Sequence, residues 1–307
     1  VQKMGNYVFM NCEKIKNIKL PSNLKSIGKT CFQGCISLTG LFIPQSVESI
    51  GGGIFADCDA LQSVEIEDEN NNFIFKDGIL YDVKNGILVS AVNSLIPEKV
   101  IVDECTKTID YYAFVDCNNL YEIEIPQGVV NIGEKAFAGL DNLKNIDIPD
   151  SVTNITTLAF YRCNGLVSVQ VPGSVTAIKN GTFRECNNLK KVILNEGVAK
   201  IEDSAFVFCS SLEQIKLPQS LTSIGSGVFG DCTSLISIEL PDNAIISSST
   251  FRGCKNLSEI VLSDTNNNYI VKNGILYNKN MTRILCYPAG IKDTEFFVPD
   301  TVKTIGD

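Results

Sequence analysis

Apolar residues return along the chain in a frame of 23 residues. The frame is L-x-x-I-x-I-P-x-x-V-x-x-I-G-x-x-A-F-x-x-C-x-x, and one full copy extends from Leu212 to Cys232. Its phenylalanine marks each copy, with spacings of 23 residues apart from one of 59 and one of 22, at positions 9, 32, 55, 114, 137, 160, 183, 206, 229 and 251. A fixed period of this length predicts a repeat architecture, in which stacked copies bury a continuous core that no single copy can form.

Each part of the frame predicts a local structure. The last four residues of L-x-x-I-x-I alternate, as in a strand with one buried face, and the segment matches the strand signature of leucine-rich repeats. Proline cannot donate a hydrogen bond to a sheet, so the proline behind this segment ends the strand. V-x-x-I predicts a second short extended piece, and the glycine that follows it suits a tight turn. A-F-x-x-C is too short for an independent helix, and we expect one helical or 3-10 turn there.

Two segments interrupt the repeats and are copies of each other, 196 residues apart. Residues 67–108 contain N-N-N-F-I-F-K-D-G-I-L-Y, and residues 263–297 contain N-N-N-Y-I-V-K-N-G-I-L-Y. The D-G and N-G dipeptides lie between strand-like runs and supply the positive φ angles of a type I′ hairpin turn. A third apolar run follows in both copies. We therefore expect each insert to be a small β-meander that stacks on the repeats.

The predicted fold class is an α/β leucine-rich-repeat solenoid that is rich in strands, has short helical or 3-10 turns and carries two β-meander inserts. The expected organisation is a single solenoid over residues 1–307. Its parts are repeats at 1–66, an insert at 67–108, repeats at 109–262, a second insert at 263–297 and the start of a further repeat at 298–307. Neither end resembles a cap, so we expect the chain to be a fragment of a longer protein.

The 23-residue unit with I-P, I-G, A-F and a trailing cysteine resembles the BspA-type leucine-rich repeats of bacterial and some protozoan surface proteins. The N-x-x-F/Y-x-x-x-D/N-G-I-L-Y insert is also similar to a segment that those proteins carry between repeat blocks. Three positions depart from the pattern: Leu140 replaces the cysteine, Asn195 replaces the proline, and the repeat that ends at Phe251 is one residue short. The resemblance implies an extracellular or cell-surface protein used in adhesion or host interaction, without catalytic residues in its repeats.

Composition excludes several functions. The chain has no histidine, which rules out the usual Ser-His-Asp and Cys-His catalytic arrangements and histidine-based zinc sites. A formal net charge of −9 argues against nucleic acid as a partner, because phosphate neutralisation needs clustered Lys and Arg. No apolar run approaches the roughly 20 residues of a membrane-spanning helix. The inserts show no converging set of nucleophile, acid and base, so we expect no enzyme, no cofactor and no metal.

The chain contains 12 cysteines, and nine of them lie three residues after a repeat phenylalanine. In a solenoid these nine form an inward-facing column. Successive coils lie about 4.8 Å apart, which exceeds the roughly 3.8 Å between the Cβ atoms of a disulfide. We therefore expect reduced thiols that pack as small apolar side chains. Cys31, Cys105 and Cys286 fall outside the column and have no assigned role.

An acidic stretch before the first insert raises a calcium site as an alternative. Glu67, Asp68 and Glu69 offer the oxygen ligands that Ca²⁺ prefers, whereas the second copy has only Asp264 in that region. A functional site is expected to recur in both copies. A polar turn is therefore the favoured interpretation.

The outward-facing side of the L-x-x-I-x-I strands is the candidate functional surface. Its x positions face outward together, and repeat proteins bind partners along such extended faces, with Tyr and Phe as anchors. The sequence predicts an extracellular protein or glycan as the partner and indicates no oligomeric state. The alternative is a structural spacer that projects another domain from the cell surface. The candidate partner-binding residues are Lys16, Lys19, Phe42, Gln62, Glu65, Tyr121, Glu122, Glu124, Lys144, Asp147, Gln170, Lys190, Lys191, Glu213, Lys216, Glu239 and Glu259.

Overall fold

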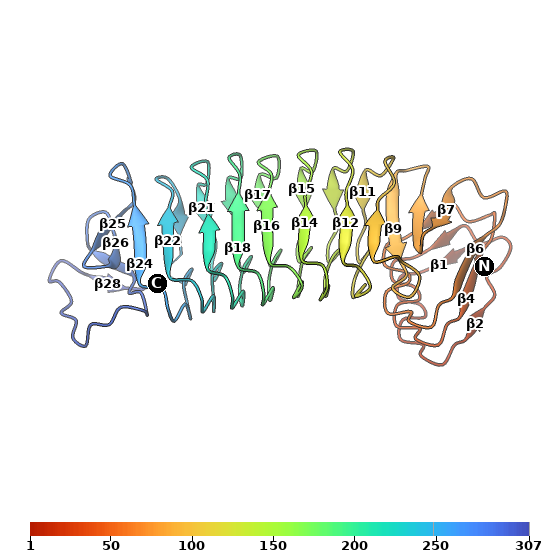
Figure 1. Cartoon of the computed structure of the whole chain (residues 1–307), viewed down its shortest axis with the longest axis horizontal. Helices are drawn as coiled ribbons and strands as arrows, with labels where there is room; N and C mark the ends of the chain where they lie inside the picture. The colour runs from red at the N-terminus through yellow and green to blue at the C-terminus, as the bar shows by residue number, and fades with distance from the viewer. Residues whose placement is uncertain (248, 307) are drawn as a thin grey trace. The chain divides into compact units, whose positions relative to one another are not determined.

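The computed structural model describes residues 1–247 and 249–306, and these residues form strands and turns without any helix (Figure 1). The chain is a β-solenoid in two compact units, Val1–Cys163 and Asn164–Asp307. A single solenoid over the whole chain stays a prediction. The predicted α/β fold class with helical or 3-10 turns is wrong, because the described residues contain strands and no helix.

The A-F-x-x-C segment explains why that prediction fails. Around the first nine repeat phenylalanines, the residues two positions before and two after have left-handed backbone angles, such as Ser204 at φ 57° and Phe208 at φ 62° around Phe206. A right-handed helix cannot continue through such residues. The N–H groups instead bond from coil to coil, as from Phe206 to the carbonyl of Val228 at 3.0 Å. Two single turns remain within the segment: Val207 N–H donates to Ser204 O at 3.2 Å, and Cys209 N–H donates to Phe206 O at 3.2 Å.

In the first unit, the strands form two rows and one meander. The L-x-x-I-x-I segments give the strands that we call ladder strands: β2 (Asn17–Ile18), β4 (Gly40–Ile43), β6 (Ser63–Ile66), β10 (Lys99–Ile101), β12 (Glu122–Glu124) and β14 (Asn145–Asp147). The V-x-x-I segments give the second row: β1 (Lys3–Met4), β3 (Ser26–Ile27), β5 (Ser49–Ile50), β11 (Thr108–Ile109), β13 (Asn131–Ile132) and β15 (Asn154–Ile155). The meander strands are β7 (Phe73–Lys76), β8 (Ile79–Asp82) and β9 (Ile87–Ala91).

The second unit repeats this arrangement. Its ladder strands are β16 (Ser168–Val171), β18 (Lys191–Leu194), β20 (Gln214–Lys216), β22 (Ser237–Leu240) and β24 (Glu259–Leu262). Its second row consists of β17 (Ala177–Ile178), β19 (Lys200–Ile201), β21 (Ser223–Ile224) and β23 (Ile245–Ile246). The meander and the final strand are β25 (Tyr269–Lys272), β26 (Ile275–Asn278), β27 (Arg283–Cys286) and β28 (Thr304–Ile305). Figure 1 shows β18, β22 and β24 following one another in chain order, with β22 and β24 side by side.

Parallel pairing at a fixed offset holds the coils together. Strand β16 pairs with β18 so that Val169 lies opposite Val192, 23 residues later, and Ser223 pairs with Ile245 where the repeat is one residue short. Buried and exposed residues alternate along the ladder strands. In β22, for example, Ile238 and Leu240 are buried and Glu239 between them is exposed. The inward residues of the coils of each unit therefore meet in a core between the rows.

Stacked phenylalanines fill this core. In the second unit, the ring centroids of Phe183 and Phe206 are 5.3 Å apart with an interplanar angle of 3°, and Phe206 and Phe229 are 5.9 Å apart. In the first unit, Phe114 and Phe137 are 5.4 Å apart. The in-register coils place identical rings above one another, at separations typical of favourable aromatic pairs.

The predicted cysteine column is confirmed, since eight of the nine repeat cysteines are buried and Cys12 is half-buried. The structure adds a polar role for them. The thiol of Cys58 donates a hydrogen bond to Phe32 O at 3.1 Å, and that of Cys209 donates to Phe183 O at 3.1 Å. Burial raises the pKa of Cys58 to about 12, which keeps the thiol protonated and able to donate. The frame thus selects a small side chain that is apolar enough for the core and still satisfies a buried carbonyl.

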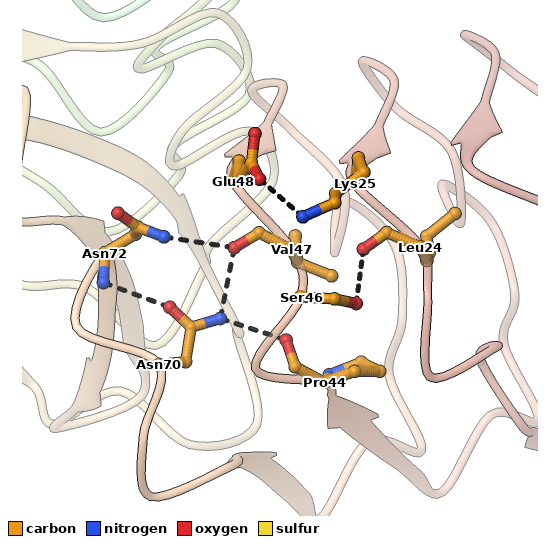
Figure 2. A network of polar contacts seen from close by, with 8 residues as sticks. All are labelled: Leu24, Lys25, Pro44, Ser46, Val47, Glu48, Asn70 and Asn72. Carbon is orange, nitrogen blue, oxygen red and sulfur yellow. Dashed lines mark hydrogen bonds and ion pairs between the residues drawn. The ribbon is translucent and has the colours of Figure 1, made fainter.

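The asparagine run of each insert attaches the meander to the preceding coil. The amide nitrogen of Asn70 donates to Pro44 O at 3.0 Å and to Val47 O at 3.2 Å, and that of Asn72 also reaches Val47 O at 3.2 Å (Figure 2). Asn72 N–H in turn donates to Asn70 Oδ1 at 3.0 Å. In the second unit, Asn268 N–H donates to Asn266 Oδ1 at 3.1 Å in the same way. These side chains satisfy backbone carbonyls at the point where the repeat frame is lost.

Both inserts form antiparallel meanders, as their turn sequences predicted. Strand β7 pairs with β8 and β8 with β9, and the corresponding strands β25, β26 and β27 pair likewise. The turn residues Asp77 and Gly78 have φ angles of 50° and 77°, and Asn273 and Gly274 have 52° and 75°. The last strand then rejoins the second row, since β9 pairs in parallel with β11. The ladder resumes at β10, inside the range 67–108 that the sequence assigned to the insert.

Replacing Phe206 with Ala is expected to lower the free energy of unfolding by about 3–5 kcal/mol, because it removes a fully buried ring between two stacked partners. The matched control is Phe297→Ala, at a ring that is 84% exposed, which should change stability by less than about 0.5 kcal/mol. Urea unfolding followed by circular dichroism measures both. Equal losses in the two variants would contradict the stacked core.

The two hairpin glycines give a second comparison. Both have left-handed angles, so alanine at either costs about 1 kcal/mol in backbone strain. A Cβ at Gly78 would also lie 2.5 Å from the backbone carbon of Leu95, whereas one at Gly274 meets only the flexible side chain of Ile291 at 3.1 Å. Gly78→Ala is therefore expected to destabilise the protein clearly more than Gly274→Ala in thermal unfolding. The reverse order would show that the first hairpin tip is not packed against Leu95.

Candidate functional site

The ladder face is the outward side of the ladder strands, and it contains the candidate partner-binding residues. All seventeen are exposed. The first unit presents Lys16, Lys19, Phe42, Gln62, Glu65, Tyr121, Glu122, Glu124, Lys144 and Asp147, and the second presents Gln170, Lys190, Lys191, Glu213, Lys216, Glu239 and Glu259. Their exposure agrees with the alternation of the strands. Their role in binding stays a prediction.

Strand register decides which candidates lie together. In the first unit, β4 and β6 bring Phe42 opposite Glu65. Beyond β6 the ladder is interrupted, because β6 pairs with β4 and β10 with β12, and no described strand bridges β6 and β10. By strand pairing, the first-unit candidates therefore lie on three stretches, β2–β4–β6, β10–β12 and β14. The sequence had predicted one extended outward face.

Strand β10 contributes ladder residues that the sequence prediction missed. The ammonium of Lys99 lies 2.8 Å from Glu122 Oε1 and 2.5 Å from Glu124 Oε1, and these hydrogen bonds raise the pKa of Lys99. All three side chains are solvent-exposed, so the ion pairs contribute little to stability and mainly fix the side chains. The missed signal was the alternation in K-V-I-V at residues 99–102, which lies 23 residues before E-I-E-I.

Exposed apolar side chains lie among the charges of the ladder face. In the first unit, Phe42 is 47% exposed, Tyr121 is 51% exposed and Ile101 is 68% exposed. Phe42 borders a cavity of about 620 Å³, which Ile18, Pro21 and Pro44 also line. In the second unit, Ile236 and Val261 are exposed as well. Such side chains lose water-exposed apolar area when a partner covers them, so they can anchor a protein or the apolar face of a sugar.

Charges on the second-unit ladder face form a small basic group. Strands β18 and β20 place Lys191 opposite Gln214 and Ile193 opposite Lys216. Lys190 lies 4.0 Å from Glu213.

Gln170 Nε2 donates to Asn195 Oδ1 at 3.2 Å, so the asparagine that replaces a proline forms a link between coils.

The acidic stretch before the first insert acts as a cap for the preceding coil. Glu67 accepts a hydrogen bond from Gln45 N–H at 2.6 Å, and Glu69 accepts one from Gln45 Nε2 at 2.9 Å. In the second copy, Asp242 accepts from Thr265 Oγ1 at 2.6 Å and from the hydroxyl of Ser263, and these hydrogen bonds lower its pKa. Among residues 1–247 and 249–306, no group of three or more His, Cys, Asp or Glu side chains is placed to hold a metal ion. The geometry therefore supports the polar turn.

Carboxylates gather at a cavity of about 290 Å³ beside the phenylalanine column of the first unit. Asp57, Asp59 and Asp116 line it together with Asn93 and Asn118. Desolvation raises the pKa of Asp116 to about 6, and the neighbouring charges of Asp57 and then Asp141 add to the effect. The sequence prediction missed this cluster, because its members lie in turns of coils that are separated by the first insert.

The repeats define the family to which the chain belongs. The model of the BspA type leucine rich repeat region matches residues 1–84, 107–210 and 178–307, in six copies. The chain is therefore a member of the BspA-type leucine-rich-repeat family, as its sequence resemblance predicted.

Solved structures of similar proteins agree with the fold. A leucine-rich repeat protein from Eubacterium ventriosum is 29% identical, with a TM-score of 0.76 over 82% of this chain and 68% of that one. A leucine-rich repeat protein from Bacteroides ovatus is 32% identical, with a TM-score of 0.62 over 86% and 65%. The pneumococcal vaccine antigen PcpA has a TM-score of 0.62 over 86% and 67% at 20% identity, which shows the fold alone. The chain spans about two thirds of the length of these structures.

No protein with a curated description matches the chain. Within the described part of the structure, no helix has the length and apolar character needed to cross a membrane.

The Asp116 cluster predicts a pH dependence. A raised pKa means that the folded state binds the proton more tightly than the unfolded state, so this contribution to the free energy of unfolding declines as the pH rises from about 4 through about 6. Replacing Asp57 with Asn should lower the pKa of Asp116 towards its ordinary value, since it removes a nearby negative charge. Carbon-13 NMR titration of the aspartate carboxyl groups measures the shift. An unchanged pKa in the Asp57→Asn variant would contradict the coupling.

Proposed function

We propose that this chain is a non-catalytic module of a cell-surface or secreted protein, and that it binds an extracellular protein or glycan through its ladder face. The observation that carries the proposal is the exposure of apolar side chains among charged ones on that face, above all Phe42 and Tyr121 in the first unit. Membership of the BspA-type family supports a surface location and a binding role.

The physical argument for binding concerns free energy. An aromatic ring that is half exposed contributes little to folding and gains more when a partner removes the remaining area from water. Pairs such as Lys99 with Glu122 are already fixed in the free protein, so less conformational entropy is lost when a partner meets them. Each unit therefore presents its own anchors in one geometry.

A structural spacer is the competing function. The parallel strands within each unit make the coils stiff, which a spacer also needs. Exposed apolar side chains also lie off the ladder face, as at Phe208 and Ile245, so the feature that favours binding is the position of Phe42 and Tyr121 among charged residues along the ladder strands.

The test is binding of the purified chain to a panel of extracellular-matrix proteins and to a glycan array. For any ligand bound through the first unit, Phe42→Ser should weaken binding about 30-fold, which corresponds to about 2 kcal/mol for a central anchor. The matched control is Phe208→Ser, because Phe208 is similarly exposed, at 42% against 47%, but lies outside the ladder face. The control should change affinity by less than about threefold. Uniform absence of binding by folded protein would refute the proposal and favour the spacer.

A further inference from the structure

The interruption of the first-unit ladder leaves two strand edges open. Along the chain, β10 is the ladder strand that follows β6, just as β6 follows β4. Strands β4 and β6 pair in parallel over four residues, but in the described part of the chain β10 hydrogen-bonds only to β12. Among the described strands, the pairs β12–β14 and β20–β22 are also unbridged, but their strands keep the 23-residue spacing of consecutive coils. Strands β6 and β10 start 36 residues apart with the meander between them, so neither has a described ladder partner on that side.

The hydrogen bonds of β10 identify which of its backbone groups are open. Val102 N–H donates to Glu124 O at 3.0 Å, and Glu122 N–H donates to Glu98 O at 3.0 Å. The even-numbered residues of β10 therefore point their backbone groups at β12. Because these directions alternate along a strand, the N–H and C=O groups of Lys99 and Ile101 point into the interruption.

The opposite edge shows the matching pattern. Glu67 N–H donates to Ile43 O at 3.0 Å, so the odd-numbered residues of β6 face β4 and the even-numbered ones, Val64 and Ile66, face the interruption. Ile66 is half-buried, whereas Ile43, its counterpart in β4, is fully buried. The end of β4 is covered by the coil that contains β6, whereas the end of β6 is only partly covered.

The β7–β8 hairpin forms an apolar floor beside the β10 edge. Its tip is fixed, because Val92 N–H donates to Gly78 O at 2.8 Å. A cavity of about 380 Å³ lies between the hairpin and β10, and the side chains of Ile79 and Tyr81 line it together with the β10 edge. An added strand lies about 4.8 Å from the strand it pairs with and places alternate side chains on its two faces. The floor can therefore receive apolar side chains from one face of an incoming strand.

Charge selects the chemistry of the occupant. Three carboxylates line this cavity, Asp77, Asp103 and Glu104, against the ammonium groups of Lys76 and Lys99. Lys99 is engaged by Glu122 and Glu124, so its charge is compensated. Across the interruption, the β6 side adds Glu65, Glu67 and Asp68. The surroundings are thus acidic and favour a basic chain.

We propose that the open edge of β10 is a strand-addition site for an extended segment of a partner protein that alternates apolar and basic residues. Its backbone pairs with Lys99 and Ile101, its apolar side chains enter the cavity lined by Ile79 and Tyr81 and pack beside the exposed Ile101, and its Lys or Arg side chains meet the surrounding carboxylates. This rests on the proposed function, since it names a partner class for one part of the ladder face.

The second insert shows the same local pattern in its own unit. Strand β24 ends in a half-buried residue, Leu262, whereas its counterpart Leu240 in β22 is buried. Among the described strands, β24 pairs with β22 and with no later ladder strand. An open ladder edge therefore accompanies the insert in both copies.

The first test uses a synthetic, end-capped peptide of seven residues that alternates lysine and valine, with fluorescence anisotropy as the readout. The wild-type chain should bind it saturably, and a glutamate–valine peptide of the same length should not bind. Ile101→Pro removes the open N–H and leaves the bonds of Val102 and Glu122 to their partners, so it should weaken binding about tenfold. Ile101→Thr is the matched control, because it changes the side chain and keeps the N–H, and it should change binding by less than about threefold.

A second measurement keeps the proposal falsifiable if the proline variant unfolds. In amide hydrogen exchange of the wild-type chain, Lys99 and Ile101 should exchange quickly in the free protein and slowly with the lysine–valine peptide, while Val100 and Val102 stay slow in both. A peptide N-methylated at alternate residues should give no protection. Unchanged exchange at Lys99 and Ile101, or equal binding to Ile101→Pro, would overturn strand addition.

The outcome separates this proposal from the broader function. Binding of a matrix protein or glycan without binding of the lysine–valine peptide would refute strand addition and leave the ladder-face function standing. Binding of the peptide that is weakened by Ile101→Pro would support strand addition. If Phe42→Ser at the same time changed the affinity for no ligand, the ladder-face anchors would be refuted.

Discussion

Hydrogen bonding between equivalent residues of successive coils is the constraint on which the structure depends. Along the rows of strands, successive coils exchange hydrogen bonds in both directions: Gly133 N–H donates to Ile109 O at 2.8 Å, and Val102 N–H donates to Glu124 O at 3.0 Å. Beside the phenylalanines the earlier coil donates to the later one, as Phe114 N–H does to Ala136 O at 2.8 Å. A fixed offset of 23 residues satisfies these groups on every side of the coil at once. It also places identical side chains above one another, so the stacked rings and the cysteine column follow from the register.

The same constraint accounts for the unusual backbone of the A-F-x-x-C segment. To bond to neighbouring coils instead of within itself, the chain must point alternate N–H groups along the solenoid axis. Left-handed residues on both sides of the first nine repeat phenylalanines achieve this, including bulky ones such as Leu158 and Phe208. Each costs of the order of 1 kcal/mol or more, which the coil-to-coil bonds and the buried ring offset. The cysteine then completes the arrangement by donating its thiol proton to the phenylalanine carbonyl of the preceding coil, as Cys232 does to Phe206.

The inserts matter because they break this register locally while keeping it elsewhere. The asparagine side chains of the first insert take over hydrogen bonds that the next coil would otherwise make, and β9 returns the chain to the second row. The ladder row has no such replacement between β6 and β10. A repeat protein normally exposes strand edges only at its ends, whereas here an edge is exposed within the first unit. Exposed anchors such as Phe42 and the open edge at Ile101 are therefore two consequences of one architecture: the ladder gives a regular outward face, and the insert interrupts it.

Sequence alone determined the repeat, the family, the strand alternation, the buried phenylalanine and cysteine columns and the hairpin turns, because each of these is a local pattern repeated many times. The exposure of the seventeen candidates followed from the same alternation. Three features were decided only by tertiary structure. The turns around Phe206 are not helical, since their N–H groups find partners 22 residues away and no local signal marks Ser204 or Phe208 as left-handed. The Asp57 and Asp116 carboxylates meet only because the coils on either side of the first insert stack. The interruption between β6 and β10 depends on how the first meander packs. Its strand β9 joins the second row, and among the described strands none of the meander pairs with β6 or β10. Local periodicity specifies how one coil is built, but which backbone groups remain without a partner depends on how the coils pack.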